Sequence, residues 1–216
     1  MIKGCLFDLD GVIVDTAKFH FLAWQRLAKS LGIDFNETQN EELKGVSRID
    51  SLKKILAWGK IEKSEEEIEK LATQKNEWYV EMINTIRPGD ELPGARSFLQ
   101  DLRNAGLKIA LGSASKNAGT ILDKLNIVSL FDAVIDGNQV KNSKPDPEVF
   151  LKGAEALGLE SMECVVFEDA LAGIEAAKAG KMYSIGIGDP SVLGIADKVF
   201  TGLNEIKLND VLSLDK

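Results

Sequence analysis

The sequence predicts an α/β fold, in which a parallel β-sheet lies between two layers of helices and an all-α domain is inserted after the first strand. Residues 95–187 alternate short apolar runs, typical of buried strands, with amphipathic helical segments, and this alternation indicates a parallel sheet. Residues 16–84 show helical periodicity without a strong strand pattern, although an apolar strand at residues 5–7 precedes them. We therefore expect a core domain of residues 1–15 and 88–216, interrupted by a helical domain of residues 16–87.

Composition and charge indicate a globular protein with a sizeable core, and they argue against some classes of partner. The 216 residues are 44% hydrophobic and 28% charged, and the formal net charge is −8. This charge argues against nucleic acid or an anionic membrane surface as the main partner. Cys5 and Cys164 fall on predicted buried strands and are expected to pack in the core. With no signal peptide and no apolar run of membrane-spanning length, a cytoplasmic monomer is expected.

Three helices are expected in the inserted domain. The first covers residues 16–31 and ends at Gly32, and the second covers residues 48–58. Ser64 and Glu67 form a capping-box pattern, which begins a third helix that extends to about residue 84.

Strands and helices alternate along the core domain. The expected strands are apolar runs that end at glycine or polar residues, and the expected helices have apolar positions at helical spacing. The strands cover residues 5–7, 107–111, 133–135, 164–167 and 183–187, and the helices cover residues 95–105, 118–125, 147–157 and 170–179.

Two aspartates, Asp8 and Asp10, directly follow the first strand. Ligands bind at the carboxyl ends of the strands in open α/β sheets, so both side chains are expected at a binding edge. Two neighbouring carboxylates repel each other unless a cation or a shared proton relieves the repulsion. An ordinary Asp-rich turn is the alternative for this motif taken alone.

Three further polar motifs follow predicted strands and are expected at the same edge. Glu168 and Asp169 offer carboxylate oxygens, which suit Mg²⁺, although Asp169 could instead cap the next helix. Ser113 and the backbone N–H groups after it could hold a phosphate, with an N-cap or a local turn as the alternative. Lys144 could neutralise a phosphoryl oxygen, with a solvated loop lysine as the alternative.

The helical domain adds three candidate features. Lys75 is predicted to lie in an apolar seam of one helix, together with Ile68, Leu71, Trp78 and Met82. It therefore either extends to solvent or reaches a cleft. His20 shares a helix face with Trp24, where a histidine is more often a packing residue than a catalyst. Residues 43–48 place two cations around a glycine turn before a helix, which makes a second anion site or simply a solvated loop.

Together, these motifs resemble the four-motif pattern of the haloacid dehalogenase superfamily of phosphoryl-transfer enzymes, and the likeness covers nearly the whole chain. The resemblance implies a Rossmann-like three-layer core with a helical cap domain. It implies that Asp8 is the nucleophile toward phosphorus, that Asp10 is the acid/base, and that Ser113 and Lys144 stabilise the transferring group. The cofactor it implies is Mg²⁺, held by Asp8, Asp10 (through its backbone carbonyl), Glu168 and Asp169.

Within the superfamily the sequence most resembles the sugar-phosphate mutases. That likeness implies interconversion of β-D-glucose 1-phosphate and D-glucose 6-phosphate, with glucose 1,6-bisphosphate as intermediate and activator. Alternatives are a sugar-phosphate phosphatase of the same superfamily and a non-catalytic sugar-phosphate sensor. The substrate-binding residues that the likeness implies are Thr16, His20, Trp24, Leu43, Lys44, Gly45, Val46, Ser47, Arg48, Ser51, Lys75, Ala114, Ser115, Lys116 and Asn117.

Overall fold

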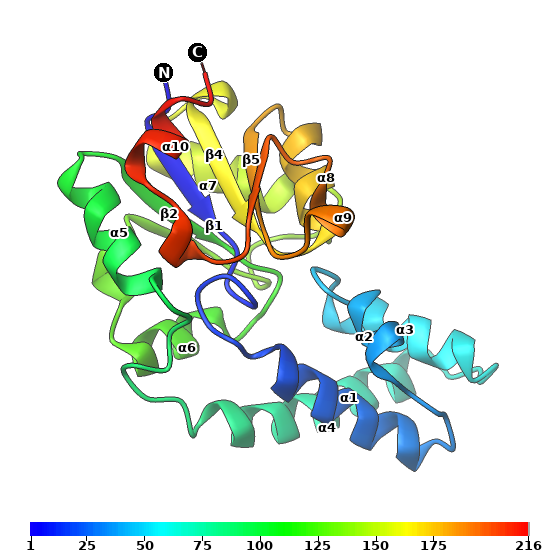
Figure 1. Ribbon diagram of the computed structural model, residues 1–216. Helices are drawn as coiled ribbons and strands as arrows, with labels where there is room; N and C mark the ends of the chain where they lie inside the picture. The colour runs from blue at the N-terminus through cyan, green and yellow to red at the C-terminus, as the bar shows by residue number, and fades with distance from the viewer. Residues whose placement is uncertain (216) are drawn as a thin grey trace.

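A six-stranded parallel sheet forms the centre of the core domain. The computed structural model describes residues 1–215, and Figure 1 shows the sheet with helices around it and a group of four helices beneath. The strand order is β3-β2-β1-β4-β5-β6, and every neighbouring pair is parallel, which confirms the predicted sheet. The strands are β1 (Gly4–Phe7), β2 (Lys108–Gly112), β3 (Ala133–Ile135), β4 (Cys164–Glu168), β5 (Tyr183–Ile187) and β6 (Lys198–Phe200).

Helices cover both faces of this sheet, as the sequence predicted. One apolar cluster joins one face to α5, α6 and α10, and a second cluster joins the other face to α7 and α8. The helices of the core domain are α5 (Ala95–Asn104), α6 (Ala118–Leu125), α7 (Glu148–Leu157), α8 (Leu171–Ala179), α9 (Pro190–Leu193) and α10 (Leu208–Leu212), with short 3₁₀ turns at Val128–Leu130, Ser161–Glu163 and Leu203–Glu205.

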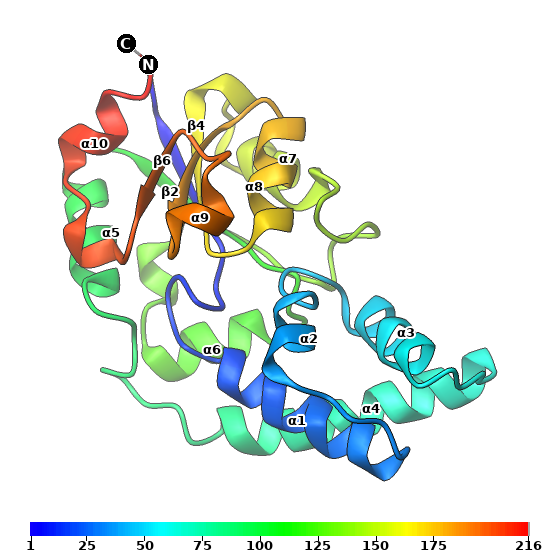
Figure 2. The ribbon, with the colours of Figure 1, turned by 45° about the vertical axis from the view of Figure 1, so that its right-hand side comes forward.

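The inserted residues form a helical cap with an apolar core of its own. Leu27, Leu52 and Ile55 are fully buried at its centre. Ser64 and Glu67 make the predicted capping box at the start of the longest helix. The cap helices are α1 (Ala17–Ser30), α2 (Glu37–Glu41), α3 (Arg48–Trp58) and α4 (Glu65–Ile83), and Figure 2 shows α2 on the side that faces the sheet.

The chain leaves and re-enters the core domain at one place, beside the end of β1. Val14, on the outgoing linker, makes isolated bridges to Asp10 and to Glu91 on the returning linker. The Leu92 N–H donates to the Ile13 carbonyl at 2.9 Å, so the two linkers are paired. The cap is therefore attached next to the edge where the first aspartates lie.

The sequence did not predict four short elements, α2, α9, β6 and α10. Helix α2 contains no buried residue, and β6 is only partly buried, so neither shows a clear apolar period.

No helix within residues 1–215 is long and apolar enough to cross a membrane.

Replacing Ser64 with alanine should destabilise the cap by about 1 kcal/mol, because the Ser64 hydroxyl accepts the Glu67 N–H at the start of α4. Urea unfolding followed by circular dichroism measures the loss. Thr73→Ala, at an exposed position inside the same helix, is the control and should leave stability almost unchanged. Equal stability of the Ser64→Ala and Thr73→Ala proteins would contradict a role for this cap.

Candidate active site

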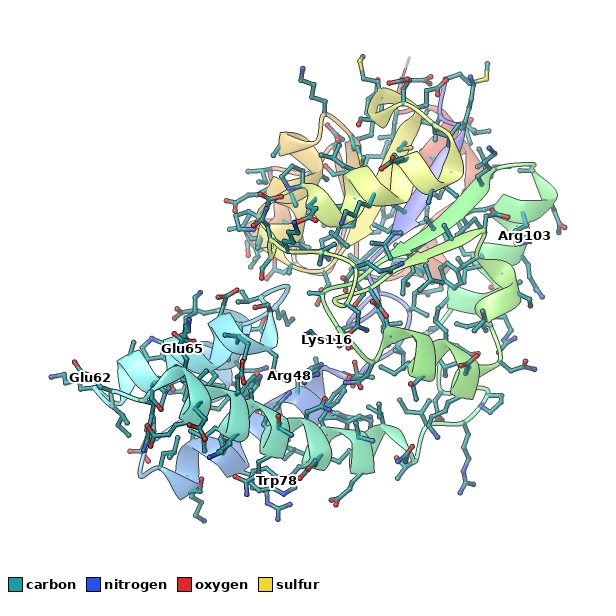
Figure 3. All side chains as sticks on the ribbon, turned by 180° about the vertical axis from the view of Figure 1, so that it is seen from behind. Arg48, Glu62, Glu65, Trp78, Arg103 and Lys116 are labelled. Carbon is teal, nitrogen blue, oxygen red and sulfur yellow. The ribbon has the colours of Figure 1, made fainter. Side chains whose placement is uncertain are left out.

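A cavity of about 130 Å³ lies between the cap and the carboxyl edge of the sheet. Figure 3 shows Arg48 of the cap and Lys116 of the core at the gap between the two parts. The cavity is lined by Asp8, Asp10, Lys144 and Asp169 and, with the exception of Thr16, by the substrate-binding residues that the sequence predicted. Thr16, Ser113 and Glu168 are buried and do not line it.

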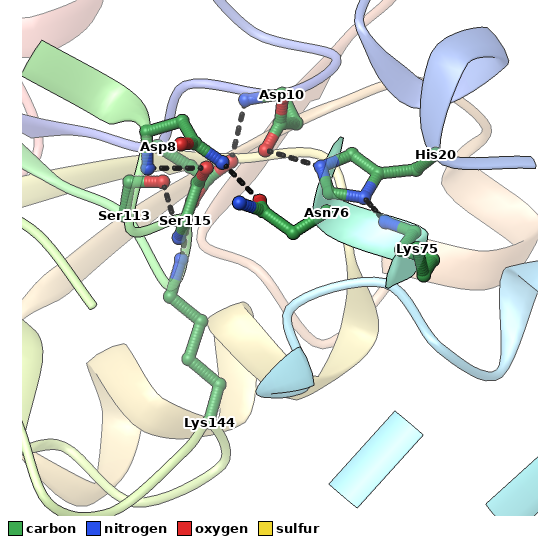
Figure 4. Close-up of polar contacts among 9 residues, drawn as sticks. Asp8, Asp10, His20, Lys75, Asn76, Ser113, Ser115 and Lys144 are labelled. Atoms are coloured by element: carbon green, nitrogen blue, oxygen red, sulfur yellow. Dashed lines mark hydrogen bonds and ion pairs between the residues drawn. The ribbon is translucent and has the colours of Figure 1, made fainter. Parts of the chain in front are cut away.

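The ammonium group of Lys144 joins two carboxylates at the base of this cavity. Its Nζ lies 2.5 Å from Asp8 Oδ1 and 2.8 Å from Glu168 Oε2 (Figure 4 shows the contact with Asp8). Burial alone would lower the pKa of Lys144, but Asp8 and Glu168 outweigh it and raise the pKa above its ordinary value. The side chain is only 1% exposed, so the alternative of a solvated loop lysine is wrong.

Sheet topology explains why these groups meet. Asp8 follows β1 and Glu168 ends β4, and β1 and β4 are hydrogen-bonded neighbours in which Phe7 pairs with Phe167. Their side chains therefore lie side by side at the carboxyl edge. Lys144 comes from the loop before α7, and the Lys144-Pro145 peptide bond in this loop is cis.

Three carboxylates at this edge could hold a metal ion. Asp8, Glu168 and Asp169 each offer an oxygen, and these atoms lie within 4.8 Å of one another. Burial raises the pKa of Glu168 to about 8, against the influence of Lys144, and raises that of Asp169 to about 6, against Lys44. A buried set of oxygen ligands with this excess of negative charge fits a hard divalent cation.

Asp169 does not cap helix α8, so that alternative is wrong. The N-cap residue is Ala170, which makes no side-chain hydrogen bond, and the Asp169 carboxylate instead pairs with Lys44 of the cap domain at 3.2 Å.

Two glycines leave room for the acidic groups. A Cβ on Gly11, where φ is +81°, would lie 2.3 Å from Asp169 Oδ2, and one on Gly173 would lie 2.0 Å from Glu168 Oε2.

Asp10 lies beside Asp8, and its surroundings favour the protonated form of its carboxyl group. The Asp10 N–H donates to Asp8 Oδ2 at 3.0 Å, and Asp10 Oδ1 is buried without a hydrogen-bond partner among residues 1–215. Burial, followed by the charges of Asp8 and Asp169, raises the pKa of Asp10 well above its ordinary value. This shift favours the protonated form of Asp10, which can donate a proton.

Cap residues surround Asp10 from the other side. Lys75 Nζ lies 2.8 Å from His20 Nδ1, and His20 Nε2 lies 3.9 Å from Asp10 Oδ2 (Figure 4). Lys75 is 1% exposed and its Nζ lies 4.4 Å from the centre of the Trp24 ring, so it does not extend to solvent. Burial and Arg48 lower the pKa of Lys75 well below its ordinary value, and burial and Lys75 do the same for His20.

Sequence reasoning missed Tyr79, which is buried in this group. Its ring centroid lies 4.1 Å from that of His20, and Lys75 Nζ lies 4.8 Å from the Tyr79 centroid. The predicted seam placed Trp78 and Met82 on the buried face, but the fully buried face is one position further along. It consists of Ile68, Ala72, Lys75, Tyr79 and Ile83. The alternation of apolar and polar residues in α4 does not separate the two registers.

Ser113 takes part in a local turn, and its predicted phosphate-binding role stays a prediction. Its Oγ accepts the Ser115 N–H at 3.1 Å in a local turn, which is the alternative interpretation of this motif. The cavity is instead lined by the residues after it, from Ala114 to Asn117. Asn117 Nδ2 donates to Asn76 Oδ1 of the cap at 2.9 Å and so joins the two domains.

A second group of cations lies on the same cavity. Arg48 is the first residue of α3, and Ser47 before it caps the helix by accepting the Asp50 N–H. Burial lowers the pKa of Arg48, but a guanidinium remains charged at neutral pH. With Lys116 also lining the cavity, Arg48 can hold an anionic group apart from Lys144 and Asp8.

The arrangement of these groups is suited to an enzyme that transfers phosphoryl groups. The sequence model of the haloacid dehalogenase-like hydrolase family matches residues 2–181. The chain is 41% identical to a β-phosphoglucomutase of Bacillus subtilis over 209 residues, which is 96% of this chain and 92% of that protein. A crystal structure of a Clostridium difficile β-phosphoglucomutase superposes with a TM-score of 0.96 at 42% identity, over 99% of this chain and 97% of that chain.

A phosphorylated-carbohydrate phosphatase of Thermotoga maritima is 32% identical over 187 residues, which is 85% of this chain and 84% of that protein. The chain therefore belongs to the haloacid dehalogenase-like hydrolase family. The similarity to the Bacillus subtilis and Clostridium difficile β-phosphoglucomutases covers nearly the whole chain and is higher than that to this phosphatase.

In buffer that contains a chelator, the contribution of Glu168 to the free energy of unfolding should fall as the pH rises. The pKa of Glu168 is raised from 4.5 to about 8, so between these pH values the folded protein keeps a proton that the unfolded chain has lost. This contribution is fully present below the unfolded value and declines up to about pH 8, by on the order of a few kcal/mol. The lowered pKa values of His20 and Lys75 act in the opposite direction, so a variant of Glu168 is needed to isolate its part. Urea unfolding at several pH values measures this slope.

Glu168→Gln is the matched variant for this slope, because glutamine keeps the shape of the side chain and does not titrate. Its free energy of unfolding should decline less between about pH 5 and about pH 8. A slope as steep as that of the unaltered protein would mean that Glu168 does not titrate as its burial implies.

Proposed function

We propose that this protein is a Mg²⁺-dependent β-phosphoglucomutase. It interconverts β-D-glucose 1-phosphate and D-glucose 6-phosphate through a phosphorylated Asp8 and β-glucose 1,6-bisphosphate. The proposal rests on the cavity, which has cationic groups at two places. Lys144 lies beside Asp8 at one place, and Arg48 and Lys116 line the other. A molecule with two phosphates needs both groups, and a monophosphate needs only one.

Asp8 is proposed as the nucleophile. Its Oδ1 is held by Lys144 and its Oδ2 by the Asp10 N–H, so the carboxylate is fixed in orientation before substrate binds. Attack by Asp8 on phosphorus forms an aspartyl phosphate and breaks the bond from phosphorus to the sugar oxygen. In the second half-reaction, a sugar hydroxyl attacks the aspartyl phosphate and Asp8 is released.

Asp10 is proposed as the acid and base in these two steps. In the first step it donates its proton to the departing sugar oxygen, and in the second it removes one from the attacking hydroxyl. The raised pKa of Asp10 supplies the protonated form that the first step requires. His20 Nε2 of the cap lies 3.9 Å from Asp10 Oδ2, and its proposed role is to orient this carboxyl when substrate is bound.

Asp8, Glu168, Asp169 and the backbone carbonyl of Asp10 are the proposed ligands of Mg²⁺. The three carboxylates fit it, because they are buried, clustered and only partly balanced by Lys144 and Lys44. When bound, Mg²⁺ supplies positive charge that balances the negative charge of the phosphoryl oxygens.

The similarity to β-phosphoglucomutases from two bacteria supports the mutase rather than the phosphatase alternative. The cap supports it as well, because its buried residues Trp24, Leu43 and Ser51 line the same cavity as Asp8, which is only 6% exposed, and a covered site favours transfer to a bound sugar over transfer to water. A phosphatase in the same family would instead transfer the phosphoryl group to water.

One assay tests the function. The purified protein is given Mg²⁺, a trace of glucose 1,6-bisphosphate and each anomer of glucose 1-phosphate in turn. Glucose 6-phosphate should form from the β anomer, with little free phosphate, and a chelator should stop the reaction until Mg²⁺ is restored. Free phosphate as the main product would support the phosphatase, and no turnover of either kind would support a sensor.

Replacing Arg48 with alanine should slow mutase turnover by about 10- to 100-fold, because a charged partner of the non-transferring phosphate is lost. Phosphorylation of Asp8 by a small acyl phosphate should be largely unchanged, since that donor has only one phosphate. Arg26→Ala is the control, because Arg26 lies in the cap but stacks on Trp78 at 4.0 Å. An equal loss of both reactions in Arg48→Ala would contradict the second phosphate site.

A further inference from the structure

The cap also touches the core at Ser143, a residue to which the proposed chemistry gives no role. The Ser47 N–H donates to Ser143 Oγ at 3.2 Å, and Ser143 Oγ donates to Asp50 Oδ2 at 3.0 Å. The Ser47 hydroxyl donates to the same Asp50 oxygen at 2.6 Å. Ser143 is thus bound to the first turn of cap helix α3, although it belongs to a loop of the core.

The same loop carries Lys144, and the cap packs directly on it. Gly45, where φ is +72°, lies against the aliphatic part of the Lys144 side chain. A Cβ at Gly45 would lie 3.3 Å from Lys144 Cδ, closer than ordinary contact, and 3.6 Å from Lys144 Cβ, so only a residue without a side chain lets the cap backbone come this near. The cap therefore holds this loop in two ways, by hydrogen bonds to Ser143 and by packing on Lys144.

This double contact matters because the position of Lys144 is constrained at its other end. Its ammonium group must lie between Asp8 and Glu168, within hydrogen-bond distance of both. Moving the adjacent Ser143 backbone would move the root of the Lys144 side chain. A displacement of about 1 Å is enough to weaken charge stabilisation at a reacting group substantially.

We propose that Ser143 and Asp50 are positioning residues that couple closure of the cap to the placement of Lys144. When the cap is closed, Asp50 and Ser47 hold Ser143, and Lys144 is fixed against Asp8. When the cap opens, these bonds are lost, and the lysine is free to move while water can enter. The site is then least reactive when it is open to water. This inference rests on the proposed mutase function.

Three variants test the coupling. Ser143→Ala removes the hydroxyl and Asp50→Ala removes its acceptor, whereas Ser143→Thr keeps a hydroxyl at the same place. Lys53→Ala is the control, because Lys53 is on the same helix but pairs with Glu65 on the cap surface. Thermal unfolding of each protein establishes that it is folded before its kinetics are compared.

Ser143→Ala should lower the rate of glucose 6-phosphate formation roughly tenfold, as expected for the loss of hydrogen bonds to a charged acceptor. The KM for β-glucose 1-phosphate should change much less, and the ratio of free phosphate to glucose 6-phosphate should rise. Ser143→Thr should restore both the rate and the ratio. The effects of Ser143→Ala and Asp50→Ala should be less than additive when combined, because both changes break the hydrogen bond between Ser143 and Asp50.

Additive effects in the double variant, or an unchanged product ratio in Ser143→Ala, would overturn the proposal. If Ser143→Ala does not fold, Asp50→Ala carries the test with the same two readouts. Failure of the proposed function is a separate outcome: the unaltered protein would then form no glucose 6-phosphate in the first place. An unaltered protein that is an active mutase, with variants that keep its rate and product ratio, would refute the coupling alone.

Discussion

The contact on which the rest of the site depends is the buried ammonium group of Lys144 between Asp8 and Glu168. Three carboxylates close together at the end of a sheet would repel one another, and each is costly to bury without a partner. Lys144 relieves part of this repulsion and fixes Asp8 at the same time. Breaking such a pair by removing one partner leaves an uncompensated buried charge.

Sheet topology provides the other half of this constraint. Because β1 lies between β2 and β4, the groups that follow these strands meet at the point where the strand order reverses. The helical cap is joined to the core beside the same point, through the paired linkers at Val14 and Glu91. A movement at the linkers would therefore change the access of water to Asp8, while the carboxylates proposed to hold the metal would remain at the edge of the sheet.

Cap and core each supply part of the candidate site. The core holds Asp8, Asp10 and the carboxylates, and the cap supplies Arg48, Lys75 and His20, which line the cavity from the cap. Lys44 contacts Asp169, and Asn76 contacts Asn117, so side chains of the cap and the core are joined around the cavity. The candidate site therefore needs both domains.

Much of this could be predicted from the sequence, because strand ends are marked by apolar runs followed by polar residues. That pattern located Asp8, Lys144 and Glu168 at one edge before any contact was known. It could not show which groups pair. Ser113 Oγ accepts a hydrogen bond within a local turn, whereas Lys144, which is 136 residues from Asp8, contacts Asp8 directly.

The sequence pattern also could not determine which face of α4 is buried, because Trp78 and Tyr79 are adjacent aromatic residues and only packing selects Tyr79 as the buried one. The contact between Ser143 and Asp50 joins residues 93 positions apart. Their side chains are short and polar, so neither stands out in the sequence, and only the fold brings them together.

The central claim is that Asp8 becomes the phosphorylated group, and its position can be determined directly. The protein is incubated with Mg²⁺ and β-glucose 1,6-bisphosphate and quenched in acid, and its peptides are then mapped by mass spectrometry. The account predicts one phosphoryl group on the peptide that contains Asp8, absent from the Asp8→Asn protein. A phosphoryl group on His20, Ser113 or Asp10 instead, or undiminished labelling of Asp8→Asn, would contradict it.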